Sequence, residues 1–197
     1  MWEKKTDENL MAGYLDGDVR AFEQLLARHR RGVYAFILRF THNRDTADEL
    51  LQDVFLKVVD KAETFQNRSK FTTWLYTITR NLCIDHLRRM RHRKTSSLDQ
   101  PLAKGEGEGM TLLDKIGSNE PAPDSSAHSR RLGQLIAVAL ENLSPEQREV
   151  FVLREQAGLA FDEIASVVNA PVNTVKSRMR YALQNLRTNL QGMGIEP

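Results

Sequence analysis

The sequence predicts an all-α protein built from two small helical domains joined by a flexible linker. The chain has 197 residues, of which 41% are apolar, and this is enough to form one or two cores. Apolar residues recur at helical spacing from about Asp18 to Met90 and again from Leu132. No stretch of comparable length alternates apolar and polar residues with a period of two, so we expect no sheet.

A change of composition separates the two helical parts. Between about Thr95 and Ser129 the chain is rich in Gly, Ser and Pro, and it contains six acidic residues but only two lysines. Such a segment is typical of a linker. We therefore expect domains at 1–94 and 130–197, with a flexible acidic linker at 95–129.

Capping residues mark helix starts in the first domain. Asn43 precedes a helix that begins near Arg44, and Ser69 precedes one that begins near Lys70. Each cap contributes about 1 kcal/mol. The apolar positions of the expected helices are Phe22, Leu25, Leu26, Val33, Phe36, Ile37, Phe40, Ala47, Leu50, Leu51, Val54, Phe55, Val58, Phe71, Leu75, Ile78 and Leu82.

The second domain contains a helix-turn-helix pattern. Ser144-Pro145-Glu146-Gln147 is a capping box with Pro at the first helical position, and it opens a helix. Further on, segment 161–180 predicts two helices joined by a tight turn, because Pro171 cannot continue the first of them. The apolar seam between these two helices would consist of Ile164, Ala165, Val168, Val175 and Met179.

The second helix of this pair carries cations near its start. Lys176, Ser177, Arg178 and Arg180 project from its first turns, where a recognition helix presents donors to base edges and phosphates. We expect Lys176 and Arg178 to contact base edges or adjacent phosphates, and Arg180 and Tyr181 to contact phosphates. The alternative is an ordinary helical hairpin with a solvated basic face.

An acidic stripe runs along the helix that begins near Arg44. Asp48, Glu49, Gln52 and Asp53 fall on its outward face, and pairs of them are four residues apart. The stripe is either a solvated face or a docking surface for a partner rich in Lys and Arg. Hydrolytic chemistry is not favoured, since no histidine or second acidic pair falls at metal-ligand spacing.

The last helix of the first domain combines aromatic and basic residues. Residues 86–94 hold five Lys or Arg and no acid, and the polar loop 66–70 lies upstream. Cations can follow a nucleic-acid backbone while aromatic faces receive unstacked bases, which indicates single-stranded nucleic acid as a ligand. A charged helix end that merely complements the helix dipole is the alternative. We assign Phe71 and Tyr76 mostly to packing and both roles to Phe65 and Trp74.

Composition bounds the function classes further. The formal net charge is only +2, so any attraction to nucleic acid must come from local clusters. One cysteine, Cys83, rules out an intrachain disulfide and lies in an apolar run that favours an inert buried thiol. No N-terminal apolar run resembles a signal peptide or a membrane span. We expect a cytoplasmic protein with no cofactor, metal or small-molecule substrate.

Several motifs together resemble one known family. Asp48–Phe55, Phe71–Asn81 and Asp85–Arg89 are similar to the second region of extracytoplasmic-function (ECF) sigma factors of RNA polymerase. Leu143–Arg148 and Pro171–Arg178 are similar to the fourth region. The resemblance covers nearly the whole chain, in the right order, with the variable linker in the right place.

The resemblance implies a function and partners for each surface. The protein would bind core RNA polymerase, at the clamp helices of the largest subunit and at the flap, and would direct promoter-specific initiation under the control of an anti-sigma factor. The polymerase-binding residues would be Asp48, Glu49, Gln52 and Asp53. The residues that open and read the minus-ten promoter element would be Phe65, Asn67, Arg68, Ser69, Lys70, Trp74, Asn81, Arg88 and Arg89. The residues that read the minus-thirty-five element would be Pro171, Asn173, Thr174, Lys176, Ser177, Arg178, Arg180 and Tyr181.

Two other classes are less well supported by the sequence. An autonomous helix-turn-helix regulator would need only the C-terminal half, so it leaves the acidic stripe and the aromatic-basic helix unexplained. A nucleic-acid hydrolase would need a metal or nucleophile cluster, for which the nearest candidates are Asp85, His86 and His92. Their setting in a basic helix favours phosphate contact.

Overall fold

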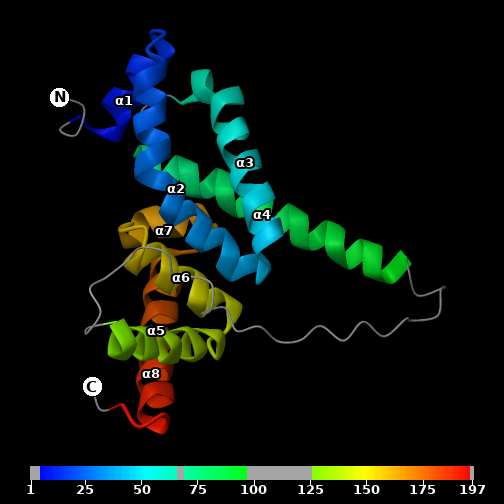
Figure 1. Cartoon of the computed structure of the whole chain (residues 1–197), viewed down its shortest axis with the longest axis vertical. Helices are drawn as coiled ribbons and strands as arrows, with labels where there is room; N and C mark the ends of the chain where they lie inside the picture. The colour runs from blue at the N-terminus through cyan, green and yellow to red at the C-terminus, as the bar shows by residue number, and fades with distance from the viewer. Residues whose placement is uncertain (1–4, 66–68, 97–125, 196–197) are drawn as a thin grey trace. The chain divides into compact units, whose positions relative to one another are not determined.

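A computed structural model describes residues 5–65, 69–96 and 126–195 of the chain (Figure 1). All regular secondary structure in those ranges is helical, so the predicted all-α class is confirmed. The helices are α1 (Asp7–Leu15), α2 (Val19–Thr41), α3 (Arg44–Asp60), the short 3-10 helix η1 (Ala62–Thr64), α4 (Phe71–Ser96), α5 (Ser126–Glu141), α6 (Pro145–Glu155), α7 (Phe161–Val168) and α8 (Val172–Gly192).

The chain divides into two compact units. One unit comprises residues 1–101 and 153–172, and the other comprises 102–152 and 173–197. Helix α5 begins before Leu132, where the apolar periodicity resumes, because the first turns of this helix are mostly polar. The predicted domain boundaries stay a prediction, since most of the expected linker lies outside the described residues.

Helices α1 to α4 pack against one another in the first unit. The apolar faces predicted for α2, α3 and α4 line this core, and Phe36, Ile37, Val54, Phe71 and Leu75 are at most 1% exposed. The predicted cap of α3 is confirmed, because the Thr46 backbone N–H donates to Asn43 Oδ1 at 2.9 Å. The cap fixes where α3 begins, and its buried face decides which side of the helix points outward.

Helices α2 and α4 approach closely at a glycine. A Cβ atom at Gly32 would lie 2.8 Å from the Tyr76 hydroxyl oxygen, so any larger residue there would force the Tyr76 side chain or one of the two helices to shift. The Tyr76 ring also packs edge-on against Phe36 at a centroid distance of 5.5 Å. Burial raises the pKa of Tyr76 to about 12, which keeps its hydroxyl protonated.

Helix α1 is an element that the sequence interpretation missed, because that interpretation began at Asp18. Its Leu10 and Met11 are fully buried. Thr6 caps the helix, since its Oγ1 accepts from the Asn9 backbone N–H at 3.2 Å. A nine-residue helix with two buried positions gives too short a pattern for periodicity to detect.

The second unit has a smaller core built from α5, α6 and α8. Ala139, Leu140, Leu143, Ala182 and Leu186 form its buried cluster. Only half of the predicted capping box of α6 is present: the Gln147 backbone N–H donates to Ser144 Oγ at 3.3 Å, but no return bond from the Ser144 N–H to the Gln147 side chain is found among the described residues. The Gln147 side chain accepts from Asn185 Nδ2 at 3.0 Å and so ties α6 to α8.

The predicted tight turn between two helices is also present. Asn169 ends α7 in the left-handed conformation, with φ 51° and ψ 54°, which asparagine tolerates better than most residues. The Ala170 backbone N–H donates to the Ala165 carbonyl at 3.1 Å, and α8 starts directly after Pro171. The residues predicted for the apolar seam are all buried: Ile164, Ala165, Val168, Val175 and Met179.

Candidate functional sites

The acidic stripe lies on the outward face of α3, where Asp48, Glu49, Gln52 and Asp53 are all exposed. The opposite face of the helix is buried through Leu50, Leu51, Val54 and Phe55. Further along the exposed face, Leu56 is 67% exposed, so an apolar side chain continues the stripe. The stripe is therefore available to a partner without any change in the packing of α3.

A shallow hollow borders the stripe at Asp48. It has a volume of about 310 Å³ and is lined by Ala27, Arg30, Arg31, Tyr34, Asp48 and Leu51. Partial burial and the negative charge of Asp48 raise the pKa of Tyr34. The sequence interpretation did not select Arg30 or Arg31, although they are adjacent cations on the outer side of α2.

Three aromatic rings cluster where η1 meets α4. The Phe65 ring lies 5.3 Å from the Trp74 ring and 5.8 Å from the Phe71 ring, measured between centroids. Phe71 and Tyr76 pack in the core as predicted, at 1% and 3% exposure. Phe65 is only 9% exposed, so its face is covered and its predicted contact with a base is less direct than that of partly exposed Trp74.

The polar candidates on and before α4 are mostly open to solvent. Ser69, Lys70, Asn81, Arg88 and Arg89 are exposed. The Arg88 guanidinium lies 3.3 Å from Asp85 Oδ1, but both side chains are more than half exposed, so this pair is weak. Two further candidates, Asn67 and Arg68, lie outside the described residues.

The residues predicted to contact DNA from the helix-turn-helix lie in the turn before α8 and along the first turns of that helix. Pro171, Asn173, Lys176, Arg180 and Tyr181 are exposed, while Thr174, Ser177 and Arg178 are half-buried. The last three still lie within reach of the surface.

Some of these side chains already have partners within α8. The Ser177 hydroxyl donates to the Thr174 carbonyl at 2.8 Å, so it is left chiefly as an acceptor. The Arg180 guanidinium lies 4.9 Å from the Tyr181 ring centroid and donates to its hydroxyl at 3.2 Å. This stacking holds a cation and a phenol together at one place on the helix.

A carboxylate of α6 lies close enough to α8 to interact with its cations. Hydrogen bonds from its own backbone N–H and from Ser144 lower the pKa of Glu146, and the positive charge of Arg178 adds to this shift. The positive charge of Arg178 is therefore felt by a carboxylate of the neighbouring helix.

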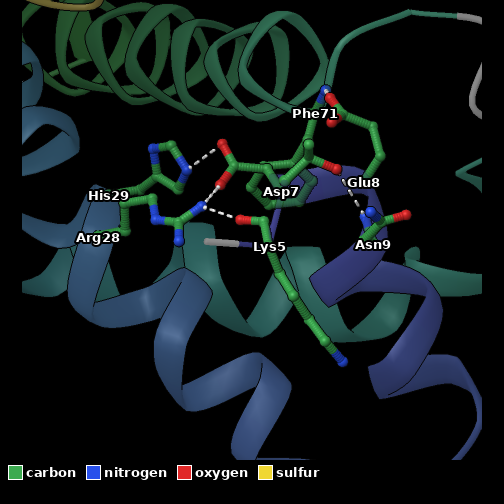
Figure 2. Close-up of polar contacts among 8 residues, drawn as sticks. Lys5, Asp7, Glu8, Asn9, Arg28, His29 and Phe71 are labelled. Atoms are coloured by element: carbon green, nitrogen blue, oxygen red, sulfur yellow. Dashed lines mark hydrogen bonds and ion pairs between the residues drawn. The ribbon is translucent and has the colours of Figure 1, made fainter. Parts of the chain in front are cut away.

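One residue outside the sequence prediction, Glu8 of α1, contacts the start of α4. Its Oε1 accepts from the Phe71 backbone N–H at 3.0 Å, at the start of α4 (Figure 2). A contact over 63 residues leaves no local pattern, so only the missed Thr6 cap could have drawn attention to this segment.

Residues 5–65, 69–96 and 126–195 hold neither a metal-binding cluster nor a membrane-spanning helix. There, no three His, Cys, Asp or Glu side chains are grouped so that they could hold a metal ion. No helix described by the structure has the length and apolar character needed to cross a membrane. Cys83 is fully buried, as predicted.

Two family models match the chain in order. The model of Sigma-70 region 2 matches residues 25–93, and the model of Sigma-70 region 4 matches residues 133–186. The chain is 30% identical over 191 residues to the ECF RNA polymerase sigma-E factor of Escherichia coli, and the match covers 97% of each protein. It is 29% identical to the ECF RNA polymerase sigma factor SigE of Mycolicibacterium smegmatis, over 96% of this chain and 71% of that one.

Solved structures of the same fold agree with these matches. The sigma factor RpoE of Bartonella quintana, solved with the anti-sigma factor NepR, aligns with a TM-score of 0.64 and 26% identity over 86% of this chain and 96% of that one. CnrH, solved with the cytosolic domain of CnrY, has the same fold with a TM-score of 0.64 and 24% identity over 95% of this chain and 99% of that one. The chain therefore belongs to the extracytoplasmic-function sigma factors of RNA polymerase.

Proposed function

We propose that this sigma factor docks on core RNA polymerase through the stripe of α3, reads the minus-ten element through α4, and reads the minus-thirty-five element through α8. As a member of its family, the chain directs promoter-specific initiation by core RNA polymerase. The observation that carries the residue-level proposal is that three surfaces of different chemistry, each exposed at least in part, lie on three different helices. Each surface lies opposite a buried face, so each is presented by a rigid element.

The polymerase contact is electrostatic in this proposal. The stripe, formed by Asp48, Glu49, Gln52 and Asp53, would meet basic residues on the clamp helices of the largest subunit. Leu56 would add apolar contact at the end of the stripe. Second contacts at the flap would come from the region 4 domain.

The minus-ten element would be read as an opened strand. Trp74 would offer its ring for stacking, which contributes about 1 to 3 kcal/mol per base. Asn81 would contribute hydrogen bonds, and Arg88 and Arg89 would hold the backbone. Phe65 would act mainly by supporting Trp74, since its own ring is covered. Ser69 and Lys70, together with Asn67 and Arg68, complete the proposed set.

The minus-thirty-five element would be read in the major groove by the first turns of α8. Lys176 and Arg178 would contact base edges or adjacent phosphates, and Arg180 and Tyr181 would contact phosphates as a stacked pair. Ser177, left chiefly as an acceptor, would suit a base-edge amino group. Pro171, Asn173 and Thr174 would set the entry of the helix into the groove.

Regulation and location complete the proposal. The Bartonella quintana relative was solved with an anti-sigma factor, and we propose that this chain is also held by one. The protein would act in the cytoplasm and would catalyse no reaction itself. Its domains would be residues 1–94 for region 2 and 130–197 for region 4, with 95–129 as the linker.

The test is run-off transcription by reconstituted holoenzyme on promoters that carry single-base changes in either element. Trp74→Ala should relax preference only in the minus-ten element, and Arg178→Ala only in the minus-thirty-five element, at about 1 to 3 kcal/mol for each lost base contact. Unchanged preference in both variants would refute the assignments. Tight, sequence-specific DNA binding without core polymerase would indicate an autonomous helix-turn-helix regulator.

A further inference from the structure

The first backbone N–H groups of a helix have no acceptor within the helix. Phe71 is the first residue of α4, and its N–H donates to Glu8 Oε1 at 3.0 Å (Figure 2). A carboxylate at this end of a helix also interacts favourably with the helix dipole. Glu8 of α1 is therefore a cap for α4, supplied from a distant part of the sequence.

Glu8 is itself held in place by its neighbour Asp7. The Asp7 carboxylate accepts from Arg28 Nη1 and from His29 Nε2, the latter at 2.7 Å (Figure 2). Arg28 also donates to the Lys5 carbonyl at 3.1 Å. With Leu10 and Met11 fully buried, helix α1 is fixed on α2 by polar and apolar contacts together. The cap on α4 thus comes from an anchored element.

The capped residue belongs to the aromatic cluster that carries Trp74. The Phe71 ring lies 5.9 Å from the Trp74 ring and 5.5 Å from the His29 ring, measured between centroids. Asp7 accepts a hydrogen bond from His29, whose ring contacts the Phe71 ring, while Glu8 accepts one from the Phe71 backbone N–H. Two adjacent carboxylates of α1 therefore constrain Phe71, one through its ring and one through its backbone. Trp74 follows Phe71 by less than one turn of α4, so a shift of the first turn would move its ring.

We propose that Glu8 is a positioning residue for minus-ten recognition: it fixes the first turn of α4 and thereby the orientation of Trp74. The inference rests on the proposed role of α4 in reading that element. Glu8 lies before residue 25, where the match to Sigma-70 region 2 begins. The residues proposed to act in minus-ten recognition therefore extend beyond the matched region.

The first test compares base preference at the two promoter elements. Holoenzymes with full-length Glu8→Ala should lose about two- to tenfold in preference at the minus-ten element, which is the effect of losing one helix cap. Preference at the minus-thirty-five element and affinity for core polymerase should not change. Glu8→Gln keeps an oxygen acceptor and should retain most of the preference. Should the Ala variant fail to fold, Glu8→Asp decides, because it keeps the charge but shortens the reach by one methylene.

The second test is a spectroscopic measurement on Trp74 in a full-length Trp2→Phe background. Glu8→Ala should make Trp74 fluorescence more accessible to acrylamide, and Glu8→Gln should not. The matched control is Glu23→Ala, which removes an exposed carboxylate of α2 and should change neither measurement.

Two results would overturn the inference. One is an unchanged base preference at the minus-ten element in folded Glu8→Ala or, if that variant does not fold, in Glu8→Asp. The other is an equal loss at both elements and in core affinity, which would indicate general destabilisation. If Trp74→Ala relaxes minus-ten preference and Glu8→Ala does not, only this inference fails. If neither Trp74→Ala nor Asn81→Ala has an effect, the proposed role of α4 fails, and the quenching measurement still decides whether Glu8 positions the ring.

Discussion

Two groups of carboxylates in the first unit have opposite surroundings. Asp7 and Glu8 of α1 are partly buried, and each accepts hydrogen bonds from another element. Glu49 and Asp53 of α3 are exposed and form no ion pair within the described part of the chain. In the sequence both groups are simply acidic residues on a helix, so burial and partners decide what each group does.

The two groups differ in how they affect stability. Asp7 and Glu8 lie in the first turn of α1, where negative charge is favourable, and they satisfy donors of α2 and α4. Glu49 and Asp53 are four residues apart on one face and repel each other mildly. The α1 carboxylates hold the fold together, whereas those of α3 are left for an outside partner.

The largest expected effect is on polymerase binding after charge reversal in the stripe. Replacing Glu49 and Asp53 together by Lys should weaken core affinity at least about tenfold. The new lysines would lie opposite the basic residues of the polymerase, and like charges so placed cost several kcal/mol. Stability should change by no more than about 0.5 kcal/mol per site, as is usual for exposed positions. Titration of labelled core enzyme and thermal unfolding measure the two quantities. Wild-type core affinity in the double variant would show that the stripe is only a solvated face.

The α1 group should show the reverse behaviour. Asp7→Ala leaves Arg28 and His29 without their shared acceptor and should destabilise the first unit by about 1 to 3 kcal/mol. Core affinity of the folded variant should stay at the wild-type value. Urea unfolding followed by Trp74 fluorescence, with Trp2→Phe as background, measures the change. A stable variant with weakened polymerase binding would reverse the roles assigned to the two groups.

A smaller effect is expected on the stability of the first unit at low pH. Burial tends to raise the pKa of Asp7, but the hydrogen bonds and charges of His29 and Arg28 outweigh it and hold that pKa below the ordinary 3.8. The stabilisation from Asp7 is therefore present above the ordinary pKa and is lost as the pH falls through the lower folded value. Unfolding free energies of the wild type and Asp7→Asn should differ at about pH 5 and converge as the pH falls through the lowered pKa of Asp7. A difference that grows with acidification would contradict the shift.

The smallest effect is expected for a carboxylate that has a partner but no burial. Asp60 at the end of α3 pairs with Lys57 at 3.0 Å, and the two side chains are 69% and 44% exposed. Asp60→Asn should change stability by less than about 0.5 kcal/mol, because exposed pairs contribute little. A larger loss in thermal unfolding would show that pairing alone, without burial, explains the contrast with Asp7.

The sequence predicted what depends on local pattern. The apolar faces of α2 to α4, the Asn43 cap and the tight turn before Pro171 follow from spacing and from the conformational preferences of single residues, and all are present. The outward position of the α3 stripe follows from the same periodicity.

What the sequence did not predict depends on contacts between distant residues. Helix α1 is too short to give a clear period, and its Glu8 acts on Phe71 across 63 residues. Phe65 packs against Trp74 and Phe71 and is only 9% exposed, which aromatic composition alone cannot show. Arg30 and Arg31 border the stripe only because α2 and α3 pack side by side.

Neutralising each carboxylate group in turn tests whether the carboxylates of α3, and not those of α1, bind the polymerase. Glu49→Gln with Asp53→Asn, and Asp7→Asn with Glu8→Gln, each remove two negative charges from the same unit. Affinity for core polymerase should be measured for both at several salt concentrations. We expect a loss of about tenfold and a weaker salt dependence for the α3 pair, and less than about a twofold change for the α1 pair. Equal losses in both variants, or no loss in the α3 variant, would contradict it.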